Sequence, residues 1–278
     1  MRGLRRLSSA AENALVAVQR HGSRGQIAEL TLNAPESLNA LTDDMGDAFS
    51  AAVARLKTEP PGSLDAVLLS GAGRAFSAGG DVGFLRQRAT AAPADNVATM
   101  RDFYRKFLCV RSLPVPTVAC LHGPAVGAGL CVALACDTRV VAADARLGLT
   151  FVGLGLHPGM AATLLAPHLL GPHAAARLLL TAELVSGAEA ARLGVGELAA
   201  DAAAARDDAL ALARRLAAGG APIATRETVK TLRAPLDAAL EAALAREAAA
   251  QATCYASADY AEGVAALAEK RKPAFSGK

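Results

Sequence analysis

Three glycine-rich segments contain the residues best suited to chemistry. They are residues 71–81 (GAGRAFSAGGD), 122–137 (HGPAVGAGLCVALACD) and 153–162 (GLGLHPGMAA). Glycine lets a backbone approach a ligand closely and adopt positive φ. Two strand-to-helix turns that each direct a backbone N–H at one point would form an oxyanion hole. The alternative is that all three are tight turns without a ligand. Neither G-x-x-x-x-G-K-[ST] nor a first-strand G-x-G-x-x-G is present, which argues against a phosphate loop or a dinucleotide site.

The first two glycine segments directly follow short apolar runs, residues 64–70 (LDAVLLS) and 117–121 (TVACL), which predict buried strands. Residues 14–20, 26–32 and 138–142 are further predicted strands. A helix is predicted to begin after Thr42, with an apolar face formed by Met45, Phe49, Ala52, Val53 and Leu56. Strands that alternate with helices indicate an α/β core with a largely parallel sheet over residues 13–200.

The composition changes at about residue 201, where Ala, Leu, Arg and Glu become dominant. Helices are predicted near residues 202–217, 221–233, 236–252 and 257–271, with breaks at Gly219-Gly220 and Pro235. Their amphipathic faces need a covering surface, either the core or another subunit. We therefore expect residues 201–278 to be a helical oligomerisation region.

The composition also excludes several classes of protein. The chain has 278 residues, 53% of them hydrophobic, and its 29 basic and 26 acidic residues give a net charge of only +3. A nucleic-acid partner is not expected from that balance. Five cysteines without C-x-x-C spacing predict neither a disulfide framework nor a metal site. Prolines interrupt the uncharged stretches 112–136 and 147–176, so a membrane span is not expected.

Residues 1–12 form a separate basic segment that contains Arg2, Arg5 and Arg6 and no acidic residue before Glu12. Arg-rich, Ser-containing N-termini are typical of organellar transit peptides. One interpretation is a transit segment and a mitochondrial matrix location. The other is a solvated basic tail on a cytoplasmic protein.

Several motifs resemble those of the crotonase (enoyl-CoA hydratase/isomerase) superfamily. They appear in the family's order and at its spacing: residues 37–42 (SLNALT), 74–82 (RAFSAGGDV), 116–137, 154–159 (LGLHPG), 180–196 and 269–275 (EKRKPAF). The resemblance implies a spiral of ββα units with a C-terminal helical trimerisation region. It also implies homotrimers, often paired as hexamers, and an acyl-CoA thioester ligand. Coenzyme A is then part of the substrate, and no separate cofactor is expected.

The resemblance assigns roles to individual residues of this chain. The backbone N–H groups of Gly80 and Ala128 would bind the thioester oxygen as an oxyanion hole. Other residues lie where the family contacts the coenzyme: Leu38, Ala40 and the segment Ser77, Ala78, Gly79, Gly80 and Asp81. Within that segment, Ser77, Ala78 and Gly79 match the positions that border the adenine. Lys270 and Lys272 match positions near the coenzyme phosphates.

The chain departs from the family at the positions of its acid and base. Hydratases of the family use two glutamates, and the matching positions here are Cys131 and Phe151. A third position, which carries Asp in some members, is Gly159. His157 is the nearest replacement base, because histidine titrates near neutrality; alternatively it only packs against the turn. Cys131 is either a nucleophile or an inert buried thiol.

Three functions remain open at this stage. The nominal one is enoyl-CoA hydration or isomerisation through a backbone oxyanion hole. The second is thioester hydrolysis or decarboxylation that depends mainly on that hole. The third is acyl-CoA binding without catalysis, which accounts for Cys131 and Phe151 without a new base.

Overall fold

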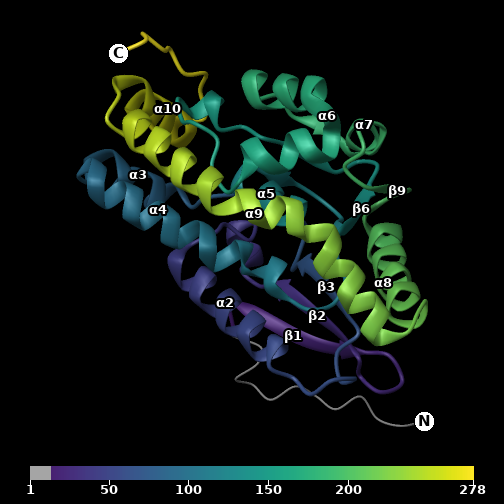
Figure 1. The fold of residues 1–278 in the computed structure, drawn as a ribbon. Coiled ribbons are helices and arrows are strands. Elements are labelled where there is room, and N and C mark those ends of the chain that lie inside the picture. Colours follow the sequence, from purple (N-terminus) through teal and green to yellow (C-terminus); the bar gives the residue numbers. More distant parts are fainter. Residues whose placement is uncertain (1–13) are drawn as a thin grey trace.

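The computed structural model describes residues 14–278 as an α/β core with helices around it (Figure 1). The predicted basic segment 1–12 lies outside the described residues. The described part of the core begins with strand β1, and the last strand, β9, ends at Ala199.

Two sheets form the core. The larger has the strand order β1-β2-β3-β4-β6-β9, in which β1 and β2 are antiparallel and all other neighbours are parallel. Its strands are β1 (Val16–His21), β2 (Ile27–Leu32), β3 (Ala66–Gly71), β4 (Thr117–Leu121), β6 (Thr138–Ala142) and β9 (Glu197–Ala199). The smaller has the order β5-β7-β8, with β5 (Ala125–Val126), β7 (Arg146–Gly148) and β8 (Val185–Ser186). The prediction of a largely parallel sheet is confirmed. Every residue of β3 and β4 is buried, as expected of strands covered on both faces.

Helices connect and cover these strands. They are α2 (Asp43–Lys57), α3 (Val82–Thr90), α4 (Pro93–Leu108), α5 (Ala128–Leu134), α6 (Ala162–Thr181), α7 (Gly187–Arg192), α8 (Ala202–Ala218), α9 (Pro222–Tyr255) and α10 (Ala258–Glu269), with 3-10 turns η1 (Pro35–Ser37), η2 (Cys109–Ser112) and η3 (Val152–Leu154). The helix predicted after Thr42 is confirmed: the Thr42 hydroxyl accepts a hydrogen bond from the Met45 N–H at 3.1 Å, and the predicted apolar face is buried. Helix α6 bends at Gly171, where the backbone leaves the helical conformation.

The prediction of a break at Pro235 is wrong. Residues 222–255 form one helix, α9, that passes through the proline. Proline removes one helical hydrogen bond, but side chains on both sides of it hold the helix to the core. Arg233 binds the Asp137 carboxylate at 2.6 Å, and Asp237 accepts a hydrogen bond from Arg111 at 2.7 Å. These contacts outweigh the local preference of the proline.

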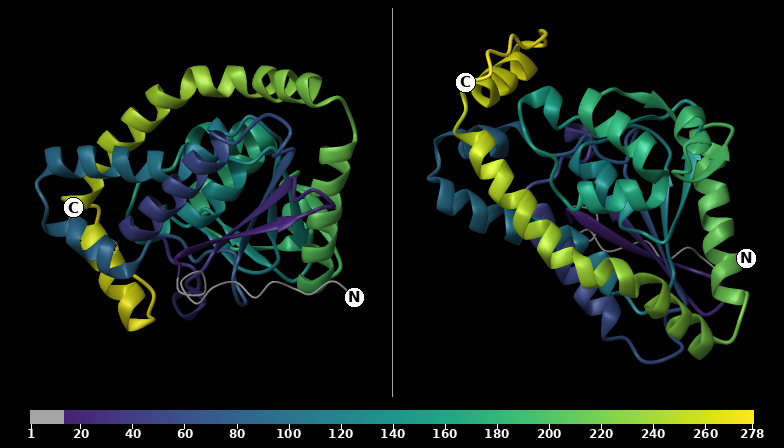
Figure 2. Two further views of the ribbon diagram at one scale, coloured as in Figure 1. Left: turned by 90° about the horizontal axis from the view of Figure 1, so that it is seen from below. Right: turned by 45° about the horizontal axis from the view of Figure 1, so that its top comes forward.

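The C-terminal helices return the chain to the core. Helix α8 packs on β3, β4 and β6, and α9 arches across the molecule to contact α4 and α6 (Figure 2). Helix α10 then packs against α3 and η3. The last two helices therefore enclose a space between α3, α4 and the loop that follows β7.

Candidate functional site

Backbone hydrogen bonds join the first two glycine-rich loops. The N–H groups of Phe76 and Ser77 both donate to the Pro124 carbonyl, and the Val126 N–H donates to the Ser77 carbonyl at 3.0 Å. Gly79 is required at this junction: its φ is +91°, and a Cβ there would lie 2.6 Å from the Val126 carbonyl oxygen and 3.6 Å from the Ala128 nitrogen. Two loops that are far apart in sequence therefore meet, as the oxyanion-hole hypothesis requires.

A third segment, residues 38–41, pairs with the first loop. The Ala78 N–H donates to the Leu38 carbonyl at 2.9 Å, and the Leu41 N–H donates to the Gly79 carbonyl at 2.7 Å. Ala40 is buried beside this pairing. The structure thus brings together the predicted coenzyme-contacting segment and the loop that carries Gly80.

Asn39 holds these segments in place and was not singled out from the sequence. Its side chain is fully buried; Oδ1 accepts a hydrogen bond from the Ala34 N–H, and Nδ2 donates to the Ala72 and Ala75 carbonyls, all at 2.9 Å. Its φ is +55°, a conformation that asparagine tolerates better than most residues. The sequence signal that could have identified Asn39 is an asparagine in the short loop before the helix predicted after Thr42.

Gly80 and Ala128 present the two predicted donors. Ala128 is the first residue of α5, and Gly80 lies between Gly79 and the helix-capping Asp81. Within the part of the chain that the structure describes, neither backbone N–H has a hydrogen-bond acceptor. Both residues line the same cavity. The arrangement can therefore accept a carbonyl oxygen from a ligand.

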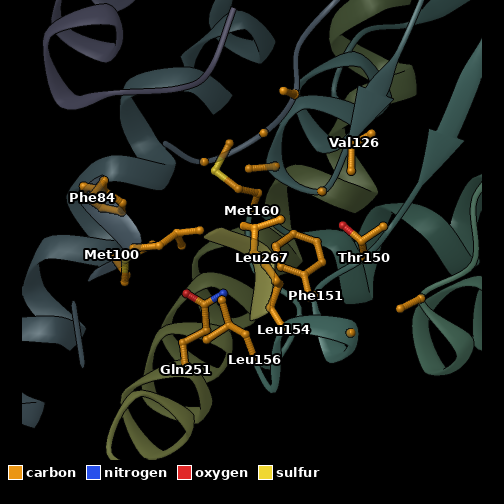
Figure 3. A pocket seen from close by; sticks show the side chains of 18 of the residues that line it. Phe84, Met100, Val126, Thr150, Phe151, Leu154, Leu156, Met160, Gln251 and Leu267 are labelled. Atoms are coloured by element: carbon orange, nitrogen blue, oxygen red, sulfur yellow. The ribbon is translucent and has the colours of Figure 1, made fainter. Parts of the chain in front are cut away.

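This first cavity has a volume of about 400 Å³ and is mainly apolar (Figure 3). Most of its large apolar side chains come from α3, α4, the loop after β7, and α10: Phe84, Leu85, Met100, Phe103, Phe151, Leu154, Leu156, Met160 and Leu267. Val126 of β5 and Leu184, which precedes β8, complete this apolar lining. Its polar side chains are Tyr104, Thr150, Gln251 and Tyr255. Among residues 14–278, no Asp, Glu, His, Lys, Arg or Cys lines it.

The two replaced glutamate positions differ in their surroundings. Phe151 lines the first cavity and is 7% exposed. Cys131 is fully buried, and its thiol contacts the Gly159 carbonyl oxygen at 3.7 Å. Burial raises the pKa of the Cys131 thiol well above its usual value, so the thiol is protonated at neutral pH. The inert buried thiol is the interpretation that this geometry supports.

Two tyrosines and a glutamine occupy the space beside Gly159. The hydroxyls of Tyr104 and Tyr255 both donate to Gln251 Oε1, at 2.7 and 2.9 Å. A Cβ on Gly159 would lie 2.6 Å from the Tyr104 hydroxyl oxygen and 2.7 Å from Gln251 Nε2, so a side chain has no room there. Burial raises the pKa of the Tyr104 phenol well above its usual value, which keeps the hydroxyl neutral. Sequence analysis missed this group because α4 and α9 supply it from positions 147 residues apart.

His157 does not meet the two backbone donors. It lines a second cavity of about 580 Å³, on the other side of the loop after β7. Its ring Nδ1 lies 2.6 Å from the Pro158 carbonyl oxygen, and its own carbonyl accepts a hydrogen bond from Gln251. His157 therefore lines the second cavity and not the cavity that Gly80 and Ala128 line.

Glu247 is a buried carboxylate, the type of group that could replace a missing catalytic glutamate. It is fully buried on α9, and burial raises its pKa above the usual value. Its oxygens accept hydrogen bonds from the N–H groups of Ala161 and Thr163 and from the Thr163 hydroxyl, at 2.6–2.9 Å. It therefore fixes the start of α6, and it does not line the first cavity.

The predicted basic residues follow α10. Leu267, near the end of that helix, lines the first cavity, and Lys270 ends the helix with a φ of +56°. Lys270 and Lys272 are exposed and do not line the cavity itself. The tail folds back on α10, where Arg271 pairs with Glu262 and Glu269. The two lysines follow the helix that carries this cavity residue.

Polar residues next to the glycine loops have structural partners. The Asp81 carboxylate accepts a hydrogen bond from the Phe84 N–H at 3.0 Å and caps α3. His122 Nδ1 lies 3.3 Å from the Cys120 carbonyl oxygen, and burial lowers its pKa.

The comparisons with known proteins agree with this geometry. Residues 22–278 match the family model described as enoyl-CoA hydratase/isomerase. A Thermus thermophilus protein named as an enoyl-CoA hydratase is 37% identical over 91% of this chain and 98% of its own. The crotonyl-CoA hydratase of Syntrophomonas wolfei is 30% identical over 91% of this chain and 95% of its own.

Solved structures show the same architecture. An enoyl-CoA hydratase from Mycobacterium avium subsp. paratuberculosis superposes with a TM-score of 0.80 at 28% identity, over 95% of this chain and 99% of that one. An enoyl-CoA hydratase/isomerase from Pseudoalteromonas atlantica gives 0.81 at 27% identity, over 94% and 100%. The fold is the crotonase fold, and the chain belongs to the enoyl-CoA hydratase/isomerase family.

No helix within residues 14–278 combines the length and the hydropathy that crossing a membrane requires.

Proposed function

We propose that this protein binds acyl-CoA thioesters and polarises their carbonyl group without the paired carboxylates of a hydratase. The thioester oxygen would accept hydrogen bonds from the N–H groups of Gly80 and Ala128, and the acyl group would occupy the first cavity. One observation carries the proposal: two unpartnered backbone donors open into a cavity whose other lining residues are nearly all apolar. Such a cavity favours an apolar acyl chain.

The lining residues determine which chemistry the cavity supports. Hydration requires a base that deprotonates water and an acid that protonates the α-carbon, and each such group is worth about 10²–10⁴-fold in rate. Neither is supplied by Cys131, which is protonated and outside the cavity, or by Phe151. The oxyanion hole alone would contribute about 10²–10³-fold. We therefore infer slow hydration, with binding and carbonyl polarisation as the main activity.

The retained donors favour one catalytic alternative, decarboxylation of a thioester that carries its own carboxylate. The bond between the α-carbon and the carboxylate would break, its electron pair would form the enolate, and CO₂ would leave. That step needs an oxyanion hole but no protein base, and solvent water would then protonate the α-carbon of the enolate and leave hydroxide. Thioester hydrolysis has less support because a water nucleophile would again need a base.

Proline at Ala128 removes the donor N–H and places a ring carbon where the thioester oxygen would lie. Ala128 is the first residue of α5, a position where proline occurs in helices. We expect Ala128→Pro to reduce the preference for acetyl-CoA over S-ethyl-CoA, a thioether without the carbonyl, by at least about 2- to 12-fold, the effect of losing one hydrogen bond. Ala202→Pro, at the first position of α8, is the matched control.

Calorimetry with both ligands measures this preference for the wild type and both variants. A wild type that binds both ligands equally would refute the oxyanion hole. A wild type without detectable binding of either at millimolar concentration would refute the ligand class. Turnover of a panel of thioesters, including a malonyl-type thioester, separates binding from decarboxylation.

A further inference from the structure

The loop after β7 is a wall, one chain thick, between two apolar cavities. Along residues 150–160, Phe151 and Leu154 line the first cavity, whereas Val152 and His157 line the second. Helix α9 continues the division, because Gln251 lines the first cavity and Cys254 the second. The two spaces are therefore neighbours separated by a few side chains.

Leu156 is the residue common to both linings in the part of the chain that the structure describes. Its side chain lies beside Gln251 at one end of the first cavity (Figure 3), and the residue is only 4% exposed. Its backbone N–H donates to the Phe151 carbonyl at 3.1 Å, which holds the loop independently of the side chain. Shortening the side chain should thus thin the wall without releasing the loop.

The second cavity has a chemistry that suits a hydrocarbon chain. Its volume is about 580 Å³, and α6 contributes Pro167, Pro172, Ala176, Leu179 and Leu180 to its lining. His157 and Thr163 are the side chains in it that carry nitrogen or oxygen, among the described residues. A polar or charged group would lose its hydration there without compensation.

We propose that Leu156 limits the length of the acyl chain that the protein accepts. In the wild type, the side chain separates the cavities and confines the acyl group to the first. Without it, a longer chain would continue from the first cavity into the second. The inference rests on the proposed function and specifies its substrate class: acyl-CoA thioesters whose chain ends before this wall.

The experiment measures, by calorimetric titration, the affinity of the protein for saturated acyl-CoA thioesters from C4 to C16. Each buried methylene should tighten binding roughly three- to fourfold until the chain reaches the wall. We expect Leu156→Ala to move that limit by several carbons and to bind chains beyond the wild-type limit at least about tenfold more tightly. Leu154→Ala is the matched control: it removes the same atoms from the same loop, but it lines the first cavity alone.

A second variant tests the path of the longer chain. Ala176 is an exposed residue of α6 that lines the second cavity. In the Leu156→Ala background, Ala176→Phe should fill that space and restore the shorter limit, whereas Ala176→Phe alone should leave the wild-type limit unchanged. Leu156→Val provides a milder change, with an intermediate limit, if the alanine variant folds poorly.

The outcomes separate this inference from the proposed function. An unchanged limit in Leu156→Ala and Leu156→Val, or an equal shift in Leu154→Ala, would overturn the role of Leu156. A longer limit that Ala176→Phe does not reverse would overturn the path into the second cavity. Absence of binding for every chain length in the wild type would instead refute the proposed function.

Discussion

At the scale of single residues, the site depends on the backbone more than on side chains. Gly80 and Ala128 contribute N–H groups, so alanine in place of glycine at 128 leaves the donor intact. These positions could be predicted from the sequence because the glycine motifs and their spacing resemble the family, and the structure places both on the first cavity. Asn39, Tyr104, Gln251 and Tyr255 could not, because their roles depend on contacts between distant segments.

Asn39 should be essential for stability. Asn39→Ala leaves one buried N–H, one buried carbonyl and one partly buried carbonyl without their side-chain partners, and each unsatisfied buried group costs about 1–3 kcal/mol. We expect a loss of about 3 kcal/mol in the free energy of unfolding, measured by urea denaturation. Ser37→Ala, which removes one hydroxyl from an exposed residue, is the control and should cost less than about 0.5 kcal/mol. Equal losses in the two variants would contradict this role.

His157→Ala should leave the chemistry unchanged. The ring lies on the second cavity, away from the two donors, so its loss removes packing but no proton transfer. Residual crotonyl-CoA turnover per folded molecule should stay within about twofold of the wild type. Abolished turnover with an intact fold, measured by circular dichroism, would restore His157 as the base.

At the scale of elements, periodicity and capping predicted much of the core. Strands β4 and β6 have the predicted bounds, and Thr42 caps α2 as expected. The error at Pro235 has a physical cause, because local preference favours a break and buried tertiary contacts override it. Arg233 is 4% exposed and binds Asp137 together with the Arg111 and Leu113 carbonyls.

The Arg233–Asp137 pair should anchor α9. Burial alone would raise the pKa of Asp137, but hydrogen bonds from Arg233 and Thr117 hold it below the usual value. Asp137→Asn leaves the buried guanidinium without its counter-charge and should cost about 3 kcal/mol at pH 7. Glu241→Gln, which breaks an exposed pair with Arg105, should cost less than about 1 kcal/mol.

The lowered pKa of Asp137 predicts how the stability difference between the wild type and Asp137→Asn changes with pH. A carboxyl group whose pKa is lowered in the folded state contributes stability above its unfolded pKa of about 3.9 and loses it as the pH falls through the folded value. The difference between wild type and Asp137→Asn should therefore be constant above about pH 5 and shrink below about pH 4. A difference that grows on acidification would contradict the assignment. Denaturant titrations at several pH values measure it.

At the scale of the whole molecule, exposed apolar side chains favour an oligomer. Ile223 and Leu232 are 79% and 70% exposed on α9, a helix that follows a core with its own apolar interior. We predict a trimer or a multiple of it, so light scattering should give about 85 kDa, three times the chain mass of 28.2 kDa, or twice that value. A stable monomer at micromolar concentration would contradict this prediction.

The most direct test of the whole account is the rate of crotonyl-CoA hydration by wild-type protein whose binding of the same ligand is measured in parallel. Typical enzymes turn over at about 1–10³ s⁻¹, and loss of both acid and base removes at least about 10⁴-fold. We therefore predict measurable binding together with hydration below about 0.1 s⁻¹. Hydration at tens per second would contradict the account, because it would require an acid–base pair that the first cavity does not contain.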